Sequence, residues 1–242
     1  MLVAFDKDCP FVELKSEMRC SEMRVLHCGS RFGLFLWPVI AIASVALADK
    51  PAEEDGFVSL FDGKTLAGWQ GKKEIFSVRD GAIVAGSLKK PIANNEFLCT
   101  TKAYEDFELR LQAKLVGPGN NAGIQFRSRR IPNHHEVIGY QCDMGAWKAG
   151  VIWGALYDES RRRKMLAEGE QVKITEVLKP NDWNDFVIRC QGNRVQIWLN
   201  GYQTVDYREK DAKIATKGIL GLQIHGGKPS VASYRKIRLK QL

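Results

Sequence analysis

The sequence predicts an all-β protein, and three observations lead to that class. Apolar and polar residues alternate over many short stretches between Gly56 and the C-terminus. Turn dipeptides such as Asp80-Gly81 and Asn200-Gly201 separate these stretches, and such pairs are typical of two-residue hairpin loops. No stretch shows apolar residues at helical spacing over the length of a stable helix. Many short strands with regular turn signals indicate a β-sandwich or jelly roll.

The expected elements follow from this alternation, one after another along the chain. The segments expected to form strands are 56–61, 76–78, 82–85, 97–99, 107–113, 123–128, 136–143, 151–158, 186–190, 194–199, 203–207, 218–225 and 231–239. Two hairpins are expected, at Asp80-Gly81 and at Asn200-Gly201. Residues 160–169 could hold one or two helical turns, and residues 168–173 are expected to form a polar loop.

The first 48 residues have the pattern of an upstream extension and a secretory signal peptide. A short basic region precedes an apolar run over 33–47, and small residues stand at 46 and 48, as signal-peptide cleavage requires. The run is short for a bilayer span, which needs about 20 residues. We therefore expect cleavage near Ala48, a flexible charged tail over 49–55, and a single β-sandwich domain over 56–242. This domain should be periplasmic or secreted, with no membrane span in the mature chain.

The net charge of +8 belongs to the mature part, because the leader carries as many acidic as basic residues. An exported protein has little reason to meet nucleic acid, so a nucleic-acid partner is not expected. The basic balance favours anionic glycans or an anionic cell surface instead. The densest basic cluster is Arg161-Arg162-Arg163-Lys164, which could equally be a solvated loop.

Three of the six cysteines lie in the mature part: Cys99, Cys142 and Cys190. Export permits disulfides, but three cysteines cannot all pair within one chain. Cys142 and Cys190 stand at apolar positions of their strands, so they are expected to be buried small hydrophobic residues, with a Cys142–Cys190 bridge as the alternative.

Polar residues share one face in three of the expected strands, because successive side chains of a strand point to opposite faces. If these strands belong to one sheet, a single face gathers amides, a cation, an acid and an imidazole. The residues are Gln125, Arg127, Gln141, Asp143, Gln223 and His225. Such a collection suits a sugar, since ligand sites place a few convergent polar groups on a rigid scaffold. The alternative is an ordinary solvated face of an antiparallel sheet.

The segment 151–158 and its neighbours supply further candidates. Trp153, Tyr157 and Glu159 have the same parity, and the two aromatic rings could stack on a sugar or belong to the core. Glu136 begins the strand that carries Asp143. His134 and His135 are a poor metal pair, because adjacent strand residues point apart. A divalent metal ion on Asp143, Glu136 or His225 remains an open possibility.

The mature chain resembles the 3-keto-disaccharide hydrolase domain family of exported bacterial proteins. The matching segments occur in order over nearly all of 57–242, and they are specific as a set. They are FVSLFDGKTLAGW, VRDGAIVA, YEDFELRLQAK, NNAGIQFRS, GYQCDMG, WGALYDE, KPNDWN, LNGYQTVDY, GILGLQIHGG and YRKIRLKQL. The resemblance implies a concanavalin-like jelly-roll sandwich of two antiparallel sheets.

The resemblance also implies glycosidic bond cleavage in sugars whose 3-hydroxyl has been oxidised to a ketone. A ketone at carbon 3 acidifies the proton on carbon 2, so a base can remove it, the enolate can expel the group on carbon 1, and water can add back. Candidate catalytic residues are Glu136, Asp143, His225 and Glu159. Candidate substrate-binding residues are Arg127, Gln125, Gln141, Trp153, Tyr157 and Gln223. Where much of the family has an acidic residue after the Gly-Tyr pair, this chain has Gln141.

Two other functions fit the same sequence features. The first is a carbohydrate-binding module of the cell envelope that uses the polar face without chemistry. The second is an envelope interaction protein that uses its basic charge, with a flat basic patch around Arg161. A carboxylate close to the shared polar face would favour the enzyme over both.

Overall fold

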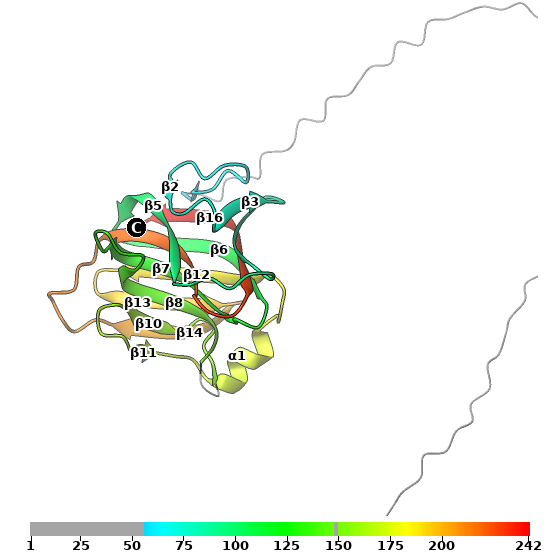
Figure 1. Ribbon diagram of the computed structural model, residues 1–242. Helices are drawn as coiled ribbons and strands as arrows, with labels where there is room; N and C mark the ends of the chain where they lie inside the picture. Colours follow the sequence, from blue (N-terminus) through cyan, green and yellow to red (C-terminus); the bar gives the residue numbers. More distant parts are fainter. Residues whose placement is uncertain (1–55, 148–149) are drawn as a thin grey trace, which may run out of the picture. The chain divides into compact units, whose positions relative to one another are not determined.

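The computed structural model describes residues 56–147 and 150–242. These residues form two antiparallel β-sheets packed face to face, with one short helix at the periphery (Figure 1). The predicted all-β class is therefore confirmed. The predicted leader over 1–48 and tail over 49–55 lie outside the described residues. No helix in the described ranges is long and apolar enough to cross a membrane.

The first sheet contains both ends of the described chain. In spatial order its strands are β14 (Tyr202–Arg208), β13 (Arg194–Leu199), β12 (Asn184–Gln191), β6 (Phe107–Val116), β16 (Ser230–Gln241), β4 (Ala82–Ser87) and β3 (Phe76–Arg79), and β1 (Val58–Ser59) pairs with β16. The two expected hairpins are present, as β3–β4 and β13–β14.

The second sheet is built mainly from the middle of the chain. In spatial order its strands are β11 (Met165–Ala167), β10 (Leu156–Glu159), β8 (Val137–Trp147), β7 (Asn121–Arg130), β15 (Gly218–Ile224), β5 (Glu96–Tyr104) and β2 (Trp69–Gln70), and β9 (Gly150–Val151) pairs with β8. All its pairings are antiparallel.

The core lies between the two sheets, and strict alternation in β6 shows how it is made. Every second residue from Phe107 to Leu115 is buried, while the residues between them are partly exposed. From the second sheet, Ile124, Phe126 and Tyr140 are buried in the same cluster. Removal of apolar surface from water at about 25 cal/mol per Å² is what holds the two layers together.

Two local predictions were wrong. Residues 151–158 do not form one strand: β9 ends at Val151, β10 begins at Leu156, and Gly154 between them has a φ of 77°. That left-handed conformation, which favours glycine, interrupts the alternation. The helix α1 (Gln171–Val177) begins in the segment expected to be loop.

The three described cysteines are buried free thiols. Cys142 lies on β8 of the second sheet and Cys190 on β12 of the first. They are therefore small residues of the core, and the alternative of a Cys142–Cys190 bridge is not what the structure has.

Candidate functional site

A chain of hydrogen bonds crosses the outer face of the second sheet from β7 to β8. The Ser128 hydroxyl donates to Gln125 Oε1 over 2.8 Å, and Gln125 Nε2 donates to Gln141 Oε1 over 2.8 Å. Gln141 Nε2 then donates to Asp143 Oδ1 over 2.5 Å. All four side chains are buried, and Gln125 is 0% exposed. Each side chain of this series thus donates a hydrogen bond to the next one. Asp143 Oδ1 accepts the last of these bonds, so Oδ2 is the oxygen of Asp143 that can carry a proton.

Glycines make room for these long side chains. A Cβ atom on Gly123 would lie 2.5 Å from Cδ of Gln141, so the Gln141 side chain occupies the space above Gly123. On β15, a Cβ on Gly221 would lie 3.1 Å from Cβ of Gln125. Both positions face the polar side of the sheet, because Gly123 pairs with Asp143 and Gly221 pairs with Gln125. The hydrogen-bonded chain therefore depends on the missing side chains of its neighbours.

Gln223 lies across Gly123 from Asp143. In the sheet register Gly123 pairs with Asp143 on one side and with Gln223 on the other, and cross-strand partners share a face. Gln223 is 0% exposed, yet neither its Nε2 nor its Oε1 has a hydrogen-bond partner in the described ranges. Buried amides are nearly always hydrogen-bonded, so such a group needs an explanation.

The Tyr234 hydroxyl lies beneath this pair, on the core side. Tyr234 belongs to β16 of the first sheet, and its Oη lies 2.6 Å from the backbone oxygen of Gln223 and 3.2 Å from that of Gly123. A residue of the opposite sheet therefore contacts the backbone of β7 at Gly123 and of β15 at Gln223.

Two carboxyl groups of the site have raised pKa values. Burial raises the pKa of Asp143 from 3.8 to about 8, and the negative charge of Glu159 adds to this, while the hydrogen bond from Gln141 opposes it. Burial, followed by the charge of Glu136, also raises the pKa of Glu159. At neutral pH Asp143 is therefore mainly protonated. Perturbed carboxyl groups of this kind are typical of functional sites.

Glu136, Glu159 and Tyr157 complete the acidic side of the site. Tyr157 pairs with Gln141 in the register, which places it on the same face. The Ser160 hydroxyl donates to Glu136 and lies 3.3 Å from Glu159 Oε1, so it links the two carboxylates. The partly buried ring of Tyr157 lies among these acids: their charges help to raise its pKa, after the larger effect of burial.

His225 lies at the end of β15 and is exposed. Its Nδ1 is 2.6 Å from the backbone oxygen of Gly226, and no hydrogen bond to Asp143 or Gln223 is found within the described chain. His225 therefore lies at the rim of the polar face, and its predicted catalytic role stays a prediction.

Arg127 does not lie on the polar face, which corrects the expected grouping. Its φ is 46°, and the register between β7 and β8 shifts between Phe126 and Arg129, as in a β-bulge. The extra residue turns Arg127 to the end of the sandwich, where it donates to the backbone oxygens of Glu105 and Gly192 and to Asp106. Ser128 takes the place expected for Arg127, because a bulge shifts the alternation by one residue.

Trp153 is also displaced from its expected position. It is 5% exposed, and its ring stacks on Phe186 of the first sheet with 6.1 Å between centroids. The left-handed Gly154 breaks the parity between Trp153 and Tyr157. Trp153 is thus a core residue, and of the two aromatic candidates only Tyr157 faces the site.

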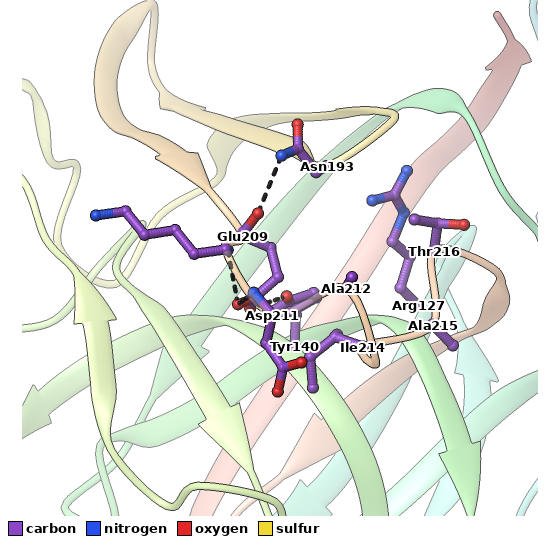
Figure 2. Close-up of a pocket in the computed structure, with 10 residues that line it drawn as sticks. Arg127, Tyr140, Asn193, Glu209, Asp211, Ala212, Ile214, Ala215 and Thr216 are labelled. Carbon is purple, nitrogen blue, oxygen red and sulfur yellow. Dashed lines mark hydrogen bonds between the residues drawn. The ribbon is translucent and has the colours of Figure 1, made fainter.

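A pocket of about 210 Å³ is lined by Arg127, Tyr140 and Glu209 among others, and Figure 2 shows these side chains. Two of its polar groups bond to each other and to a neighbour: Tyr140 donates to Glu209 over 2.5 Å, and Arg162 Nη2 donates to the same carboxylate over 2.6 Å. Although burial acts in the opposite direction, the hydrogen bonds from Arg162 and Tyr140 lower the pKa of Glu209. These contacts indicate a structural role for this pocket.

The basic cluster at Arg161 is not a flat patch. Arg161 Nε donates to Asp158 Oδ1 over 2.8 Å, and Arg162 bonds both Asp158 and Glu209. Asp158 is 0% exposed. Arg161 and Arg162 therefore neutralise buried acids, whereas Arg163 and Lys164 are exposed, so the predicted interaction surface there stays a prediction.

Three residues of the site were missed by the sequence analysis: Ser128, Ser160 and Gly123. Gly123 could have been found, because a glycine at a polar-face position next to Gln125 marks a close approach of another side chain. Ser128 was hidden by the bulge. As for a metal, no group of three or more His, Cys, Asp or Glu in the described ranges is arranged to hold an ion.

Solved structures include sandwiches that are similar to this one. A candidate glycosyl hydrolase from Parabacteroides distasonis has a similar structure, with a TM-score of 0.58, 20% identity, and coverage of 77% of this chain and 94% of that one. Carbohydrate-binding module CBM66 from Bacillus subtilis gives a TM-score of 0.55 and 15% identity, with coverage of 72% and 96%. At these identities the likeness shows the fold alone. The class that they define is a jelly-roll β-sandwich of two antiparallel sheets.

The family follows from the sequence match. The 3-keto-alpha-glucoside-1,2-lyase-like domain matches residues 56–240, and the chain belongs to this family. The 3-keto-disaccharide hydrolase of Bacteroides thetaiotaomicron is 29% identical over 89 residues, which are 34% of this chain and 30% of that protein. The match thus spans under a third of that relative.

Proposed function

We propose that the protein cleaves glycosidic bonds in 3-keto glycosides, by elimination followed by hydration, on the outer face of the second sheet. The observation that carries the proposal is the pair of Asp143 and Glu159. These are two carboxyl groups with raised pKa values, beside a buried amide chain, in a member of a 3-keto-glucoside lyase-like family. Paired acids with shifted pKa values are the usual equipment for moving protons at neutral pH.

Asp143 is assigned as the general acid. Gln141 donates to its Oδ1, so the proton that Asp143 holds at neutral pH lies on Oδ2. This proton passes to the oxygen that leaves carbon 1 when the glycosidic bond breaks. The Gln125–Gln141 chain keeps the carboxyl group in one orientation throughout this step.

Glu159 is assigned as the base. It removes the proton from carbon 2, the electron pair forms the enolate of the 3-ketone, and the enolate then expels the group on carbon 1. Water adds to carbon 1 of the resulting enone, and carbon 2 regains a proton, so the net reaction is hydrolysis. Ser160, shared between Glu136 and Glu159, orients the base. Tyr157 lies beside both acids, where it can contact the sugar ring.

The second candidate function is sugar binding without chemistry. The observation that favours it is the near-complete burial of Gln125, Gln141 and Asp143, whose hydrogen bonds to one another hold them in a fixed arrangement. A fixed set of polar groups is sufficient for binding. In either case we propose a carbohydrate partner and an exported protein, periplasmic or secreted, processed near Ala48.

The test is release of the leaving group from a 3-keto disaccharide by the purified protein, with the unoxidised disaccharide in parallel and with and without a chelator. Turnover of the keto sugar alone is expected. Asp143→Asn and Glu159→Gln should each lower kcat by roughly 10²-fold or more, while Asp185→Asn on the first sheet should leave it unchanged. Binding of both sugars without release from either would instead establish the binding module.

A further inference from the structure

Gln223 is a buried amide whose donor and acceptor both lack a partner among the residues that the structure describes. It is 0% exposed, and neither Nε2 nor Oε1 is hydrogen-bonded within the described ranges. An unpaired buried amide destabilises the folded state, because its donor and acceptor lose their hydrogen bonds to water and gain none in return. The other two glutamines of this face, Gln125 and Gln141, are both hydrogen-bonded to side chains. Gln223 is therefore the exception on its own face.

The position of Gln223 in the sheet relates its unpaired amide to Asp143, the proposed general acid. Gly123 separates Gln223 from Asp143 in the sheet register, and the side chain of Gln141 lies over Gly123. Phe97 on β5 flanks Gln223 on the other side, and it is buried. A ligand group that pairs with Gln223 would thus have the polar side chains of Gln141 and Asp143 on one side and the apolar ring of Phe97 on the other.

The chemistry of an amide limits what this ligand group can be. A glutamine side chain presents a donor and an acceptor side by side. The matching partner is an acceptor next to a donor. In a sugar, two adjacent hydroxyl groups supply this pair, and so does a ketone oxygen beside a hydroxyl group, which is the pair that the proposed function selects. Nε2 would donate to the ketone oxygen, and Oε1 would accept from the neighbouring hydroxyl.

We propose that Gln223 is the specificity-determining residue of the site. Its side-chain amide binds the oxygen at carbon 3 together with an adjacent hydroxyl of an α-hydroxy ketone. This inference rests on the proposed function and names the part of the substrate that one residue recognises. A site built to pair with a substrate oxygen strongly rejects the analogue that lacks it, because the buried polar group is then left unpaired.

The first variant is Gln223→Met, which keeps the length of the side chain and removes both polar atoms. Without sugar, Gln223→Met should raise the melting temperature, since an unpaired buried amide is replaced by an apolar group. The matched control is Gln125→Met, which should lower the melting temperature because its partners Ser128 and Gln141 lose their hydrogen bonds.

Binding is then measured by calorimetry with methyl 3-keto-glucoside and methyl 3-deoxy-glucoside, with Glu159→Gln added to every protein so that the keto sugar is not cleaved. The protein with the native Gln223 should prefer the keto sugar, and Gln223→Met should reduce this preference by about tenfold or more. Gln223→Glu supplies a second arm: its neutral form is again a donor and an acceptor, whereas its ionised form only accepts. The keto preference of Gln223→Glu should therefore be present at low pH and lost at high pH.

The outcomes separate this inference from the proposed function. If the wild-type protein neither binds nor cleaves the keto sugar, the proposed function is wrong, and this inference with it. If the protein with the native Gln223 prefers the keto sugar and Gln223→Met keeps the same preference, the inference alone is overturned. A fall in stability or a failure to fold in Gln223→Met would show that the amide is structural, which also overturns it.

Discussion

The outer faces of the two sheets follow the same alternation and have opposite character. On the first sheet, Lys114 and Arg235 lie over the ring of Trp183, at 4.9 Å and 4.0 Å from its centroid, and the side chains of Arg194 and Asp206 are 38% and 44% exposed. On the second sheet, Gln125, Gln141 and Asp143 are buried. One face is a solvated surface with paired charges, and the other is a buried polar layer.

The difference shows what burial adds to a polar residue. On the solvated outer face of the first sheet, water can replace a lost partner, so each ion pair contributes little to stability. On the buried face the same groups must bond to one another or to a ligand, and their pKa values shift. Substitutions matched between the two faces are therefore the sharpest way to test the comparison.

The largest contrast is expected for carboxylates in ion pairs, where the solvated face is compared with a buried carboxylate on the core side of the second sheet, since Asp158 pairs with the core residue Tyr140. Asp158 is 0% exposed and bonds Arg161 and Arg162, so Asp158→Ala should lower the free energy of unfolding by about 3–5 kcal/mol. Asp206→Ala removes the partner of Arg194 on the solvated face of the first sheet and should leave the free energy of unfolding nearly unchanged. Urea denaturation of both variants measures the contrast, and similar losses in the two would contradict it.

The next contrast is the pH dependence due to Asp143. Its folded pKa of about 8 lies above the ordinary value of 3.8, so the folded protein binds this proton more tightly than the unfolded chain. The resulting stabilisation is complete below the unfolded pKa and is lost as pH rises toward 8. The free energy of unfolding should fall by about 3 kcal/mol from pH 5 to pH 8 on this account.

Asp143→Asn removes the titrating group and should flatten this dependence, and it should make the protein more stable than wild type at pH 8. Asp185→Asn, on the outer face of the first sheet, is the control and should keep the wild-type slope. Denaturation midpoints at a series of pH values measure the effect. An unchanged slope in Asp143→Asn would mean that its carboxyl group is ionised across this range.

A smaller contrast is expected for glutamines. Gln125→Leu leaves Gln141 Oε1 and the Ser128 hydroxyl without their partner in a buried layer, and should cost about 2 kcal/mol. Gln112 on β6 donates to Asp185 and accepts from Arg235 on the solvated face, where water can replace both partners, so Gln112→Leu should change stability by about 0.5 kcal/mol or less. Thermal unfolding compares the two, and equal shifts would show that the amide chain is not stabilising.

The smallest change in stability is expected for substitutions of charged residues on the solvated face of the first sheet. Lys114→Glu replaces the cation over Trp183 and should change the free energy of unfolding by less than about 0.5 kcal/mol. It should leave turnover of the keto sugar unchanged, because Lys114 lies on the sheet opposite Asp143. Steady-state kinetics at low salt measures this. A marked loss of turnover would show that the two faces are coupled.

Alternation in the sequence predicted the fold class, both hairpins and the shared face of Gln125, Gln141 and Asp143. It could not predict where alternation breaks, because a bulge and a left-handed glycine depend on the backbone of neighbouring strands. Arg127 was misplaced by a bulge and Trp153 by Gly154, each by a change of one residue in parity. Alternation also does not show whether a face of a sheet is exposed to solvent. The burial of Gln223 and the raised pKa of Asp143 could therefore be found only from the packed structure.

The hydroxyl of Tyr234 connects the core to the polar face from behind. It reaches from the first sheet to the backbone oxygens of Gly123 and Gln223, on two neighbouring strands whose other surface carries the polar layer. Under the proposed function, a substitution at Tyr234 would therefore shift the backbone beneath the sugar. Substrate preference would then change while every residue that lines the polar face stays the same.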